Sequence, residues 1–306
     1  MRKSIVCLLC FLCVVQLKLQ AQPGATDSVK TESPVVAKGA KLQLISNKYS
    51  FTEGPAVDKK GNVFFSDQPN DKIYKWNAST GEVTVFLDST GRSNGMMFDK
   101  KGNLITCADE HNQVLSISPK KKIKVLLTDI NGLHINGPND VWVTKKGAVY
   151  ITDPYYQRAY WTRKAPEIKA QNVYYIQKDK APVTVVDDMM QPNGIIGTPD
   201  GKYLYVADIR GNKTFKYTIA ADGTLKEKTL YLSKGSDGMT IDNKGNIYIT
   251  GRGITVYNPA GEQIDFIDIT GDRTTNVTFG GKKRDILFIT ATRSVYTLQM
   301  KVKGNQ

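Results

Sequence analysis

Short runs in which apolar and polar residues alternate recur along most of the chain. Six segments share one pattern: an oxygen-bearing side chain, a short apolar run, a turn that is usually rich in glycine, and an alternating run. They are EGPAVDKKGNVFFSD from residue 53, NGMMFDKKGNLITCAD from 94, NDVWVTKKGAVYITD from 139, NGIIGTPDGKYLYVAD from 193, DGMTIDNKGNIYITG from 237 and NVTFGGKKRDILFITA from 276. Because alternation with a period of two is typical of β-strands, and no segment keeps a helical period, the chain is predicted to be all-β.

The six segments predict one repeated architecture. Their starting residues are spaced by 39 to 54 positions, and most are followed by a third and often a fourth short strand. Four short strands in a repeat of roughly 40–45 residues are typical of a β-propeller blade. We therefore expect a six-bladed β-propeller with four antiparallel strands per blade over residues 41–303. The strand-like stretch 41–45 precedes the first repeat, and we expect it to pair with the outer edge of the last blade and close the ring.

The first 40 residues lack this repeat. Arg2 and Lys3 precede an apolar stretch over residues 5–15, and Ala21 is a small residue at a suitable cleavage position. This pattern predicts a signal peptide over residues 1–21, so we expect a periplasmic or secreted protein with no integral membrane span after cleavage. A retained membrane anchor is the alternative, although the apolar stretch is short for a bilayer. Residues 22–40 have no periodicity and are predicted to form a flexible tether.

Composition and charge narrow the possible chemistry. The chain of 306 residues has only two histidines and four cysteines, which leaves little material for a zinc or haem site. After removal of the signal peptide only Cys107 remains, so we expect no internal disulfide. The net charge is +13, and lysine pairs occupy several of the predicted turns. We interpret them as solvated turns that could make weak contact with an anionic envelope surface, and we expect no nucleic-acid partner because no binding motif is present.

The geometry of a propeller brings the repeat starts together. The first strand of each blade lines the central channel, so the side chains that begin the six repeats should meet at one mouth. They are Glu53, Asn94, Asn139, Asn193, Asp237 and Asn276. Asn-Gly and Asp-Gly are also typical of hairpin turns, but that alternative accounts for only three of the six starts. The feature shared by all six is a side-chain oxygen, which favours a ligand cluster.

A cluster of carboxylate and amide oxygens suits a hard cation. Calcium accepts six to eight such ligands in flexible geometry, whereas magnesium requires tighter octahedral geometry. Glu53 and Asp237 would together neutralise one divalent ion, and without an ion they would repel each other. We therefore predict a Ca²⁺ site, with other divalent cations possible.

Several of these segments resemble a known family. FTEGPAVDKKGNVFFSD, GPNDVWV, ITDPYY, QPNG and SDGMTID are similar to the motifs of the gluconolactonase/regucalcin family, which consists of calcium-dependent six-bladed propeller lactonases. The resemblance covers residues 41–302. It implies four metal ligands, which are Glu53, Asn139, Asn193 and Asp237. It also implies that Asp237 donates and accepts the catalytic proton.

Other positions are weaker candidates. Asn94 and Asn276 match no family ligand, so we treat them as candidates for substrate contact or for contact with the metal ligands. His134 stands where relatives often carry another basic residue, which leaves substrate preference open. Aspartates end the second strands at positions 67, 109, 153 and 208, where such residues most often cap the strand or accept hydrogen bonds from loop amides. Among them Asp153, in DPYY, is a further candidate for substrate contact. His111 could act as a proton shuttle or as a hydrogen-bonded loop histidine.

The longest spacing is due to an insertion over residues 154–172, PYYQRAYWTRKAPEIKAQN, which carries four aromatic residues including Tyr155. It could be an aromatic plug that packs on the edge of a blade. It could instead be a lid that excludes water and selects the substrate, and Tyr155 would then contact the substrate.

The function expected from these features is calcium-dependent hydrolysis of a lactone, such as the sugar lactone gluconolactone. The metal would polarise the carbonyl, and Asp237 would act as general acid and base. Direct attack by Asp237 remains open. A serine hydrolase is not indicated, because no G-x-S-x-G segment is present. The alternatives are an esterase or organophosphate hydrolase that uses the same site, and a non-catalytic propeller that binds carbohydrate or protein.

Overall fold

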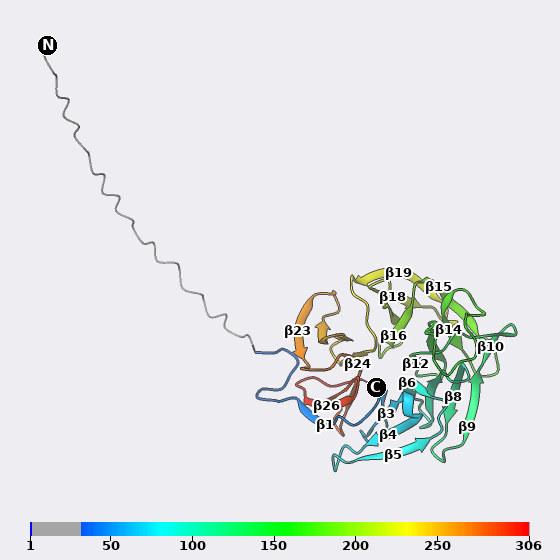
Figure 1. Ribbon diagram of the computed structural model, residues 1–306, viewed down its shortest axis with the longest axis horizontal. Coiled ribbons are helices and arrows are strands. Elements are labelled where there is room, and N and C mark those ends of the chain that lie inside the picture. Colours follow the sequence, from blue (N-terminus) through cyan, green and yellow to red (C-terminus); the bar gives the residue numbers. More distant parts are fainter. Residues whose placement is uncertain (2–31, 306) are drawn as a thin grey trace. The chain divides into compact units, whose positions relative to one another are not determined.

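The computed structural model describes Met1 and residues 32–305, and the chain divides into two units, Met1–Glu32 and Ser33–Gln306. The second unit contains six four-stranded antiparallel sheets arranged around a common centre (Figure 1). This arrangement confirms the predicted all-β, six-bladed propeller. The predicted signal peptide, apart from Met1, and residues 22–31 of the predicted tether lie outside the described residues.

The first three blades follow one another along the chain. Blade one consists of β2 (Thr52–Val57), β3 (Val63–Asp67), β4 (Lys72–Trp76) and β5 (Val83–Asp88). Blade two consists of β6 (Ser93–Phe98), β7 (Leu104–Ala108), β8 (Gln113–Ile117) and β9 (Ile123–Leu127). Blade three consists of β12 (Val141–Val143), β13 (Val149–Asp153), β14 (Gln171–Ile176) and β15 (Val183–Met189). A hairpin of β10 (Asp129–Ile130) and β11 (Leu133–His134) connects blades two and three.

The last three blades repeat the pattern. Blade four consists of β16 (Pro192–Gly197), β17 (Tyr203–Asp208), β18 (Lys213–Ile219) and β19 (Leu225–Leu232). Blade five consists of β20 (Met239–Ile241), β21 (Ile247–Thr250), β22 (Gly253–Tyr257) and β23 (Gln263–Asp268). Blade six consists of β24 (Thr274–Gly280), β25 (Ile286–Ala291), β26 (Ser294–Gln299) and β1 (Gln43–Ser46).

The ring is closed by strands from opposite ends of the propeller sequence. β1 pairs antiparallel with β26, as the sequence predicts, so the last blade contains the first strand. The chain before β1 also belongs to this blade: Val35 is buried, and Val36 forms a β-bridge with Met300. The described residues 33–40 of the predicted tether are therefore packed against the propeller rather than extended away from it. These residues pack there because Val35 belongs to a hydrophobic cluster of the propeller. If they were extended into solvent, the apolar side chains of this cluster would be exposed to water.

Burial follows strand position within a blade. Both faces of the inner strands β2 and β3 are buried, whereas β5 at the outer edge is mostly half-buried or exposed. The inner strands lie between two neighbouring blades, so side chains on both of their faces contact a hydrophobic core. In the described part of the chain, no helix has the length and apolar character that crossing a membrane requires.

The inner strands approach one another very closely around the channel. The N–H of Gly95 in blade two donates to the carbonyl oxygen of Asn139 in blade three at 2.8 Å. Gly54 has a φ of 51°, and a Cβ on this residue would lie 1.9 Å from the carbonyl oxygen of Asn94 in the next blade. The glycines after Glu53 and Asn94 are therefore required by backbone packing between blades rather than by hairpin turns.

This packing predicts the effect of a single methyl group. We expect Gly54→Ala to lower the free energy of unfolding by at least about 2 kcal/mol more than Gly81→Ala, measured by urea denaturation. Gly81 is a matched control, since its φ is also positive, at 74°, but no atom lies within 4 Å of a Cβ placed there. Both variants share the strain of a left-handed alanine, about 1–2 kcal/mol. Equal decreases in the free energy of unfolding for the two variants would show that the inner strands can move apart to admit a methyl group without loss of stability.

Candidate active and metal-binding site

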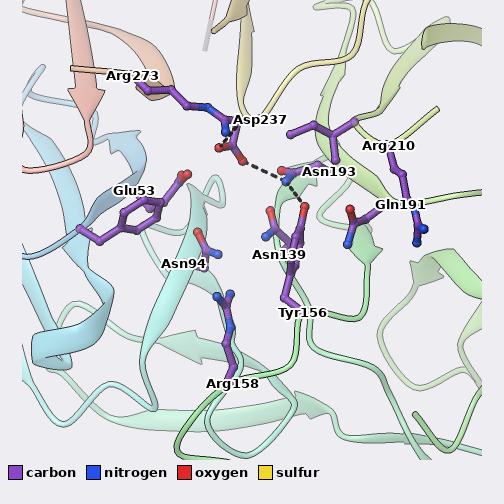
Figure 2. Close-up of a pocket in the computed structure, with 12 residues that line it drawn as sticks. Glu53, Asn94, Asn139, Tyr156, Arg158, Gln191, Asn193, Arg210, Asp237 and Arg273 are labelled. Atoms are coloured by element: carbon purple, nitrogen blue, oxygen red, sulfur yellow. Dashed lines mark hydrogen bonds and ion pairs between the residues drawn. The ribbon is translucent and has the colours of Figure 1, made fainter. Parts of the chain in front are cut away.

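Five of the six predicted repeat starts line one cavity of about 370 Å³ (Figure 2). They are Glu53, Asn94, Asn139, Asn193 and Asp237. Each lies at or just before the first residues of an inner strand, and these strands all begin at the same end of the channel. The structure therefore brings together all four predicted metal ligands and the predicted catalytic acid–base residue.

The sixth repeat start occupies a different position. Asn276 does not line this cavity, and its Nδ2 lies 3.2 Å from Glu53 Oε2 and 3.4 Å from Asp140 Oδ2. Its own Oδ1 accepts a hydrogen bond from the N–H of Val277. Asn276 thus donates a hydrogen bond to the Glu53 carboxylate. It is placed to contact a predicted metal ligand rather than a substrate in this cavity.

The ionised form of the carboxylates in the channel is unfavourable without a nearby cation. Burial raises the pKa of Glu53 well above its usual value, and the charges of Asp237 and Asp140 raise it further. Burial also raises the pKa of Asp237, while Arg273 and the Asn193 amide act in the opposite direction. Burial raises the pKa of Asp140 to about 7. Buried like charges of this kind are stabilised by a proton or by a cation.

The donor atoms fit a hard cation. The Oδ1 of Asn94 is buried, with no hydrogen-bond partner among the described residues. In this part of the chain, no group of three or more histidine, cysteine, aspartate or glutamate side chains could hold a metal. Two carboxylates and several amides are therefore the available ligands, a set that suits calcium better than zinc.

Aspartates at the ends of the second strands position the chain that leads into the six repeat starts, the anchors of the blades. Asp67 accepts hydrogen bonds from the N–H groups of Ser50 and Phe51, at 3.1 and 3.0 Å. Asp208 accepts from the N–H groups of Met190 and Gln191, both at 2.9 Å. In each case the bonded amides lie two or three residues before an anchor of the same blade.

Asp153 has the same structural role in blade three. It is fully buried and accepts hydrogen bonds from the N–H groups of Asn136 and Gly137, both at 2.8 Å. Burial raises its pKa to about 7. Because it does not line the cavity, the structure places it as a support for Asn139 rather than as a substrate contact.

Two further candidates lie away from the cavity. His111 is exposed in the loop after β7 and is not among the lining residues. Tyr155 is not in the lining either, and its hydroxyl donates to Gln157 Oε1 at 2.5 Å. The next residue, Tyr156, lines the cavity instead, with its hydroxyl 3.1 Å from the Nδ2 of Asn193.

The insertion over residues 154–172 is anchored on Asp109 of blade two. Arg158 Nε donates to Asp109 Oδ2 at 2.7 Å, and the Tyr160 hydroxyl donates to Oδ1 of the same carboxylate. The Trp161 side chain is buried, and its Nε1 donates to the Asp109 carbonyl oxygen at 2.7 Å. Trp161 therefore fills the blade edge as a plug, while Tyr156 and Arg158 form one wall of the cavity.

Seven lining residues were not predicted from the sequence. They are Phe51, Tyr156, Arg158, Gln191, Ile209, Arg210 and Arg273. Phe51 and Gln191 each precede an anchor by two positions, so in an extended chain they share the anchor's face. The alternation of side chains along a strand could therefore have predicted both residues as part of the cavity lining. The other five lie on loops, where no periodic pattern indicates the direction of a side chain.

Comparison with known proteins agrees with this geometry. Residues 51–293 match the family described as the SMP-30/gluconolactonase/LRE-like region. The gluconolactonase of Zymomonas mobilis is 28% identical over 296 residues, an alignment that covers 86% of this chain and 82% of that protein. The lactonase drp35 of Staphylococcus epidermidis is 26% identical over 278 residues, covering 82% of each protein.

Solved structures show the same fold. A gluconolactonase from Xanthomonas campestris has a TM-score of 0.80 at 25% identity, over 87% of this chain and 91% of the other. A calcium-binding regucalcin from Agrobacterium tumefaciens has a TM-score of 0.72 at 20% identity, over 87% and 95%. Since the family match extends over most of the propeller and includes every cavity anchor, the chain belongs to the SMP-30/gluconolactonase/LRE-like family.

Proposed function

We propose that this protein is a calcium-dependent hydrolase that opens a lactone ring, with a sugar lactone such as gluconolactone as the first substrate to test. The observation that carries the proposal is the convergence of Glu53 and Asp237 with three asparagines in one cavity. Named gluconolactonase and lactonase relatives over most of the chain support a lactone-hydrolysing enzyme. Nothing in the cavity favours an esterase or a non-catalytic binding module over this function.

The chain offers one set of ligands for the ion. Glu53, Asn139, Asn193 and Asp237 would hold calcium through their side-chain oxygens, and the unpartnered Asn94 Oδ1 lies in the same lining. When bound, a divalent ion supplies a Lewis acid that polarises the lactone carbonyl. The two carboxylates would also lose their mutual repulsion.

Asp237 is placed to move the proton. Its Oδ1 accepts a hydrogen bond from Asn193 Nδ2 at 2.9 Å, and its Oδ2 lies 3.6 Å from Arg273 Nη2. Burial raises the pKa of this carboxyl group, which favours proton exchange closer to neutral pH. As water attacks the carbonyl carbon, Asp237 takes the water's proton, the ring C–O bond breaks, and Asp237 returns the proton to the departing ring oxygen.

Other lining residues bind and shield the substrate. Burial raises the pKa of Tyr156 to about 12, so its hydroxyl stays protonated at neutral pH and can donate a hydrogen bond. Phe51 and Ile209 supply apolar surface in a cavity that is otherwise polar. Together these side chains can hold a polyhydroxylated ring while part of its solvent is excluded.

We also propose export to the periplasm or the medium, on the basis of the N-terminal sequence pattern. The lysine pairs in the turns between the first two strands of four blades are exposed. These turns lie at the end of the inner strands opposite the anchors. Weak contact with an anionic surface would therefore leave the cavity open to solvent.

The proposed chemistry predicts a calcium-dependent and Asp237-dependent rate. In a pH-stat, we expect hydrolysis of gluconolactone to stop on chelation and return when calcium is restored. Asp237→Asn should lower kcat by about 10²-fold or more, because the acid–base group is lost. Asp188→Asn, an exposed aspartate of blade three, is the control and should keep the wild-type rate. Turnover that survives chelation, or an active Asp237→Asn variant, would contradict the proposal.

The buried carboxylates predict a pH effect on stability without metal. A raised pKa in the folded state means that the folded protein binds more protons, so its free energy of unfolding should fall as pH rises above about 4. In chelator at pH 7, we expect Glu53→Gln to be more stable than wild type by about 1 kcal/mol or more, measured by urea denaturation. Saturating calcium should reverse this order, because the variant loses a ligand.

Glu82→Gln, which removes an exposed glutamate, is the matched control and should change stability little under either condition. Destabilisation by Glu53→Gln in chelator would show that the carboxylate is already neutralised by its protein neighbours.

A further inference from the structure

We propose that the cavity selects lactones that carry a carboxylate group, and that Arg158 on the 154–172 insertion binds this carboxylate. The inference rests on the proposed lactonase function, and it names the substrate class. In this arrangement the lactone carbonyl would lie beside the proposed metal ligands, and Arg158 would bind the carboxylate at the far end of the substrate.

The charges that line the cavity favour an anion. Three arginines line it, Arg158, Arg210 and Arg273, but only two acids, Glu53 and Asp237. Arg158 is paired with Asp109, which lies outside the lining, and both lining acids are assigned to the cation and to proton transfer. Arg210 and Arg273 therefore keep a positive charge at the cavity. A bound divalent cation would make the lining still more positive. A neutral polyhydroxylated lactone would leave this positive charge uncompensated, whereas a carboxylate would compensate it.

Arg158 is held rigidly in position. Its side chain is 25% exposed and bonds through Nε to Asp109, whose side chain is 2% exposed. Asp109 is itself fixed by the Tyr160 hydroxyl and by Gln68 Nε2 at 3.0 Å. The Arg158 guanidinium also lies over the ring of Tyr156, 5.5 Å from its centroid. Little conformational entropy remains to be lost when a ligand binds this side chain.

The outer end of Arg158 is free to bind a ligand. Within the described residues its two terminal nitrogens make no hydrogen bond, and Figure 2 shows them directed into the cavity beside Asn94. A planar guanidinium with two free terminal NH₂ groups matches the geometry of a carboxylate and can bind it through two parallel hydrogen bonds. An arginine that is three-quarters buried and keeps its fork unpaired is best explained by an anionic ligand.

The other two arginines are less suited to this role. Arg273 Nη2 lies 3.6 Å from Asp237 Oδ2, so this side chain is engaged with the proposed acid–base residue. Arg210 is exposed, and no carboxylate in the described part of the chain holds it in place. It adds positive charge at the cavity, which raises the rate of encounter with an anion.

A competing role for Arg158 is stabilisation of the negative charge that develops on any lactone during hydrolysis. That role would affect neutral and anionic substrates alike. Only recognition of a substrate carboxylate predicts that loss of Arg158 changes the ratio between the two substrates.

The kinetic test compares the matched γ-lactones of gluconic and glucaric acid, which differ in a hydroxymethyl group against a carboxylate. We expect wild type to prefer the glucaric lactone by about tenfold or more in kcat/KM, in line with a charge-assisted pair. Arg158→Gln should abolish this preference, because it should lower kcat/KM for the glucaric lactone by about tenfold or more beyond any loss on the gluconic lactone. Arg252→Gln, an exposed arginine outside the cavity lining, should keep it. Preference for the neutral lactone, or equal losses on both, would overturn the inference.

A binding test separates this inference from the lactonase proposal. Glucuronate and glucose differ in the same way but have no lactone bond, and their affinities can be measured by calorimetry with calcium present. We expect glucuronate to bind about tenfold or more tightly than glucose to wild type and to Arg252→Gln, but not to Arg158→Gln. If Arg158→Gln still binds glucuronate more tightly than glucose, the carboxylate binds to the metal rather than to Arg158, and the inference is overturned.

The two proposals can fail separately. If neither lactone is hydrolysed while Arg158-dependent discrimination of glucuronate remains, the lactonase proposal fails and the anion site stands. If lactones are hydrolysed while glucuronate and glucose bind alike, the anion site is overturned and the lactonase stands.

Discussion

Close packing of six inner strands around a narrow channel is the constraint on which the site depends. Gly54 and Gly95 sit where the backbone of the next blade leaves no room for a Cβ. Because the strands are this close, the side chains at their starting ends have to share one small volume. Carboxylates and amides that are far apart in the sequence therefore become neighbours through backbone geometry alone.

That proximity is unfavourable by itself, and the surrounding residues moderate it. Glu53 accepts hydrogen bonds from the Gly54 N–H and from Asn276, while Asp237 has Asn193 and Arg273 beside it. These contacts reduce the cost of burying two acids but do not neutralise both of them. The site thus keeps an affinity for positive charge, a common compromise between stability and function in buried polar clusters.

The repeated parts of this structure could be predicted from the sequence, whereas most of the non-repeated parts could not. The blade repeat predicted the ring, its closure by residues 41–45 and the convergence of Glu53, Asn94, Asn139, Asn193 and Asp237, because each property follows from strand periodicity. Loop residues such as Arg158 obey no period, and only the three-dimensional contact with Asp109 reveals their direction. Asp153, His111 and Tyr155 were predicted as candidates for the site, but they do not line the cavity. The direction of a side chain at a strand end or in a loop depends on local hydrogen bonds, which follow no period in the sequence.

The pairing of β1 with β26 has a consequence for how the protein is made. Residues 43–46 have no partner strand until residues 294–299 have left the ribosome. Loop closure over this long separation is slow, so the sheet of the last blade is completed only after residues 294–299 have been synthesised. Until then the ring stays open, and Thr275 cannot donate its hydroxyl hydrogen bond to the carbonyl oxygen of Thr52. A nascent chain that lacks these residues therefore cannot hold the anchors of blades one and six together, and the site is assembled only after the last blade has formed.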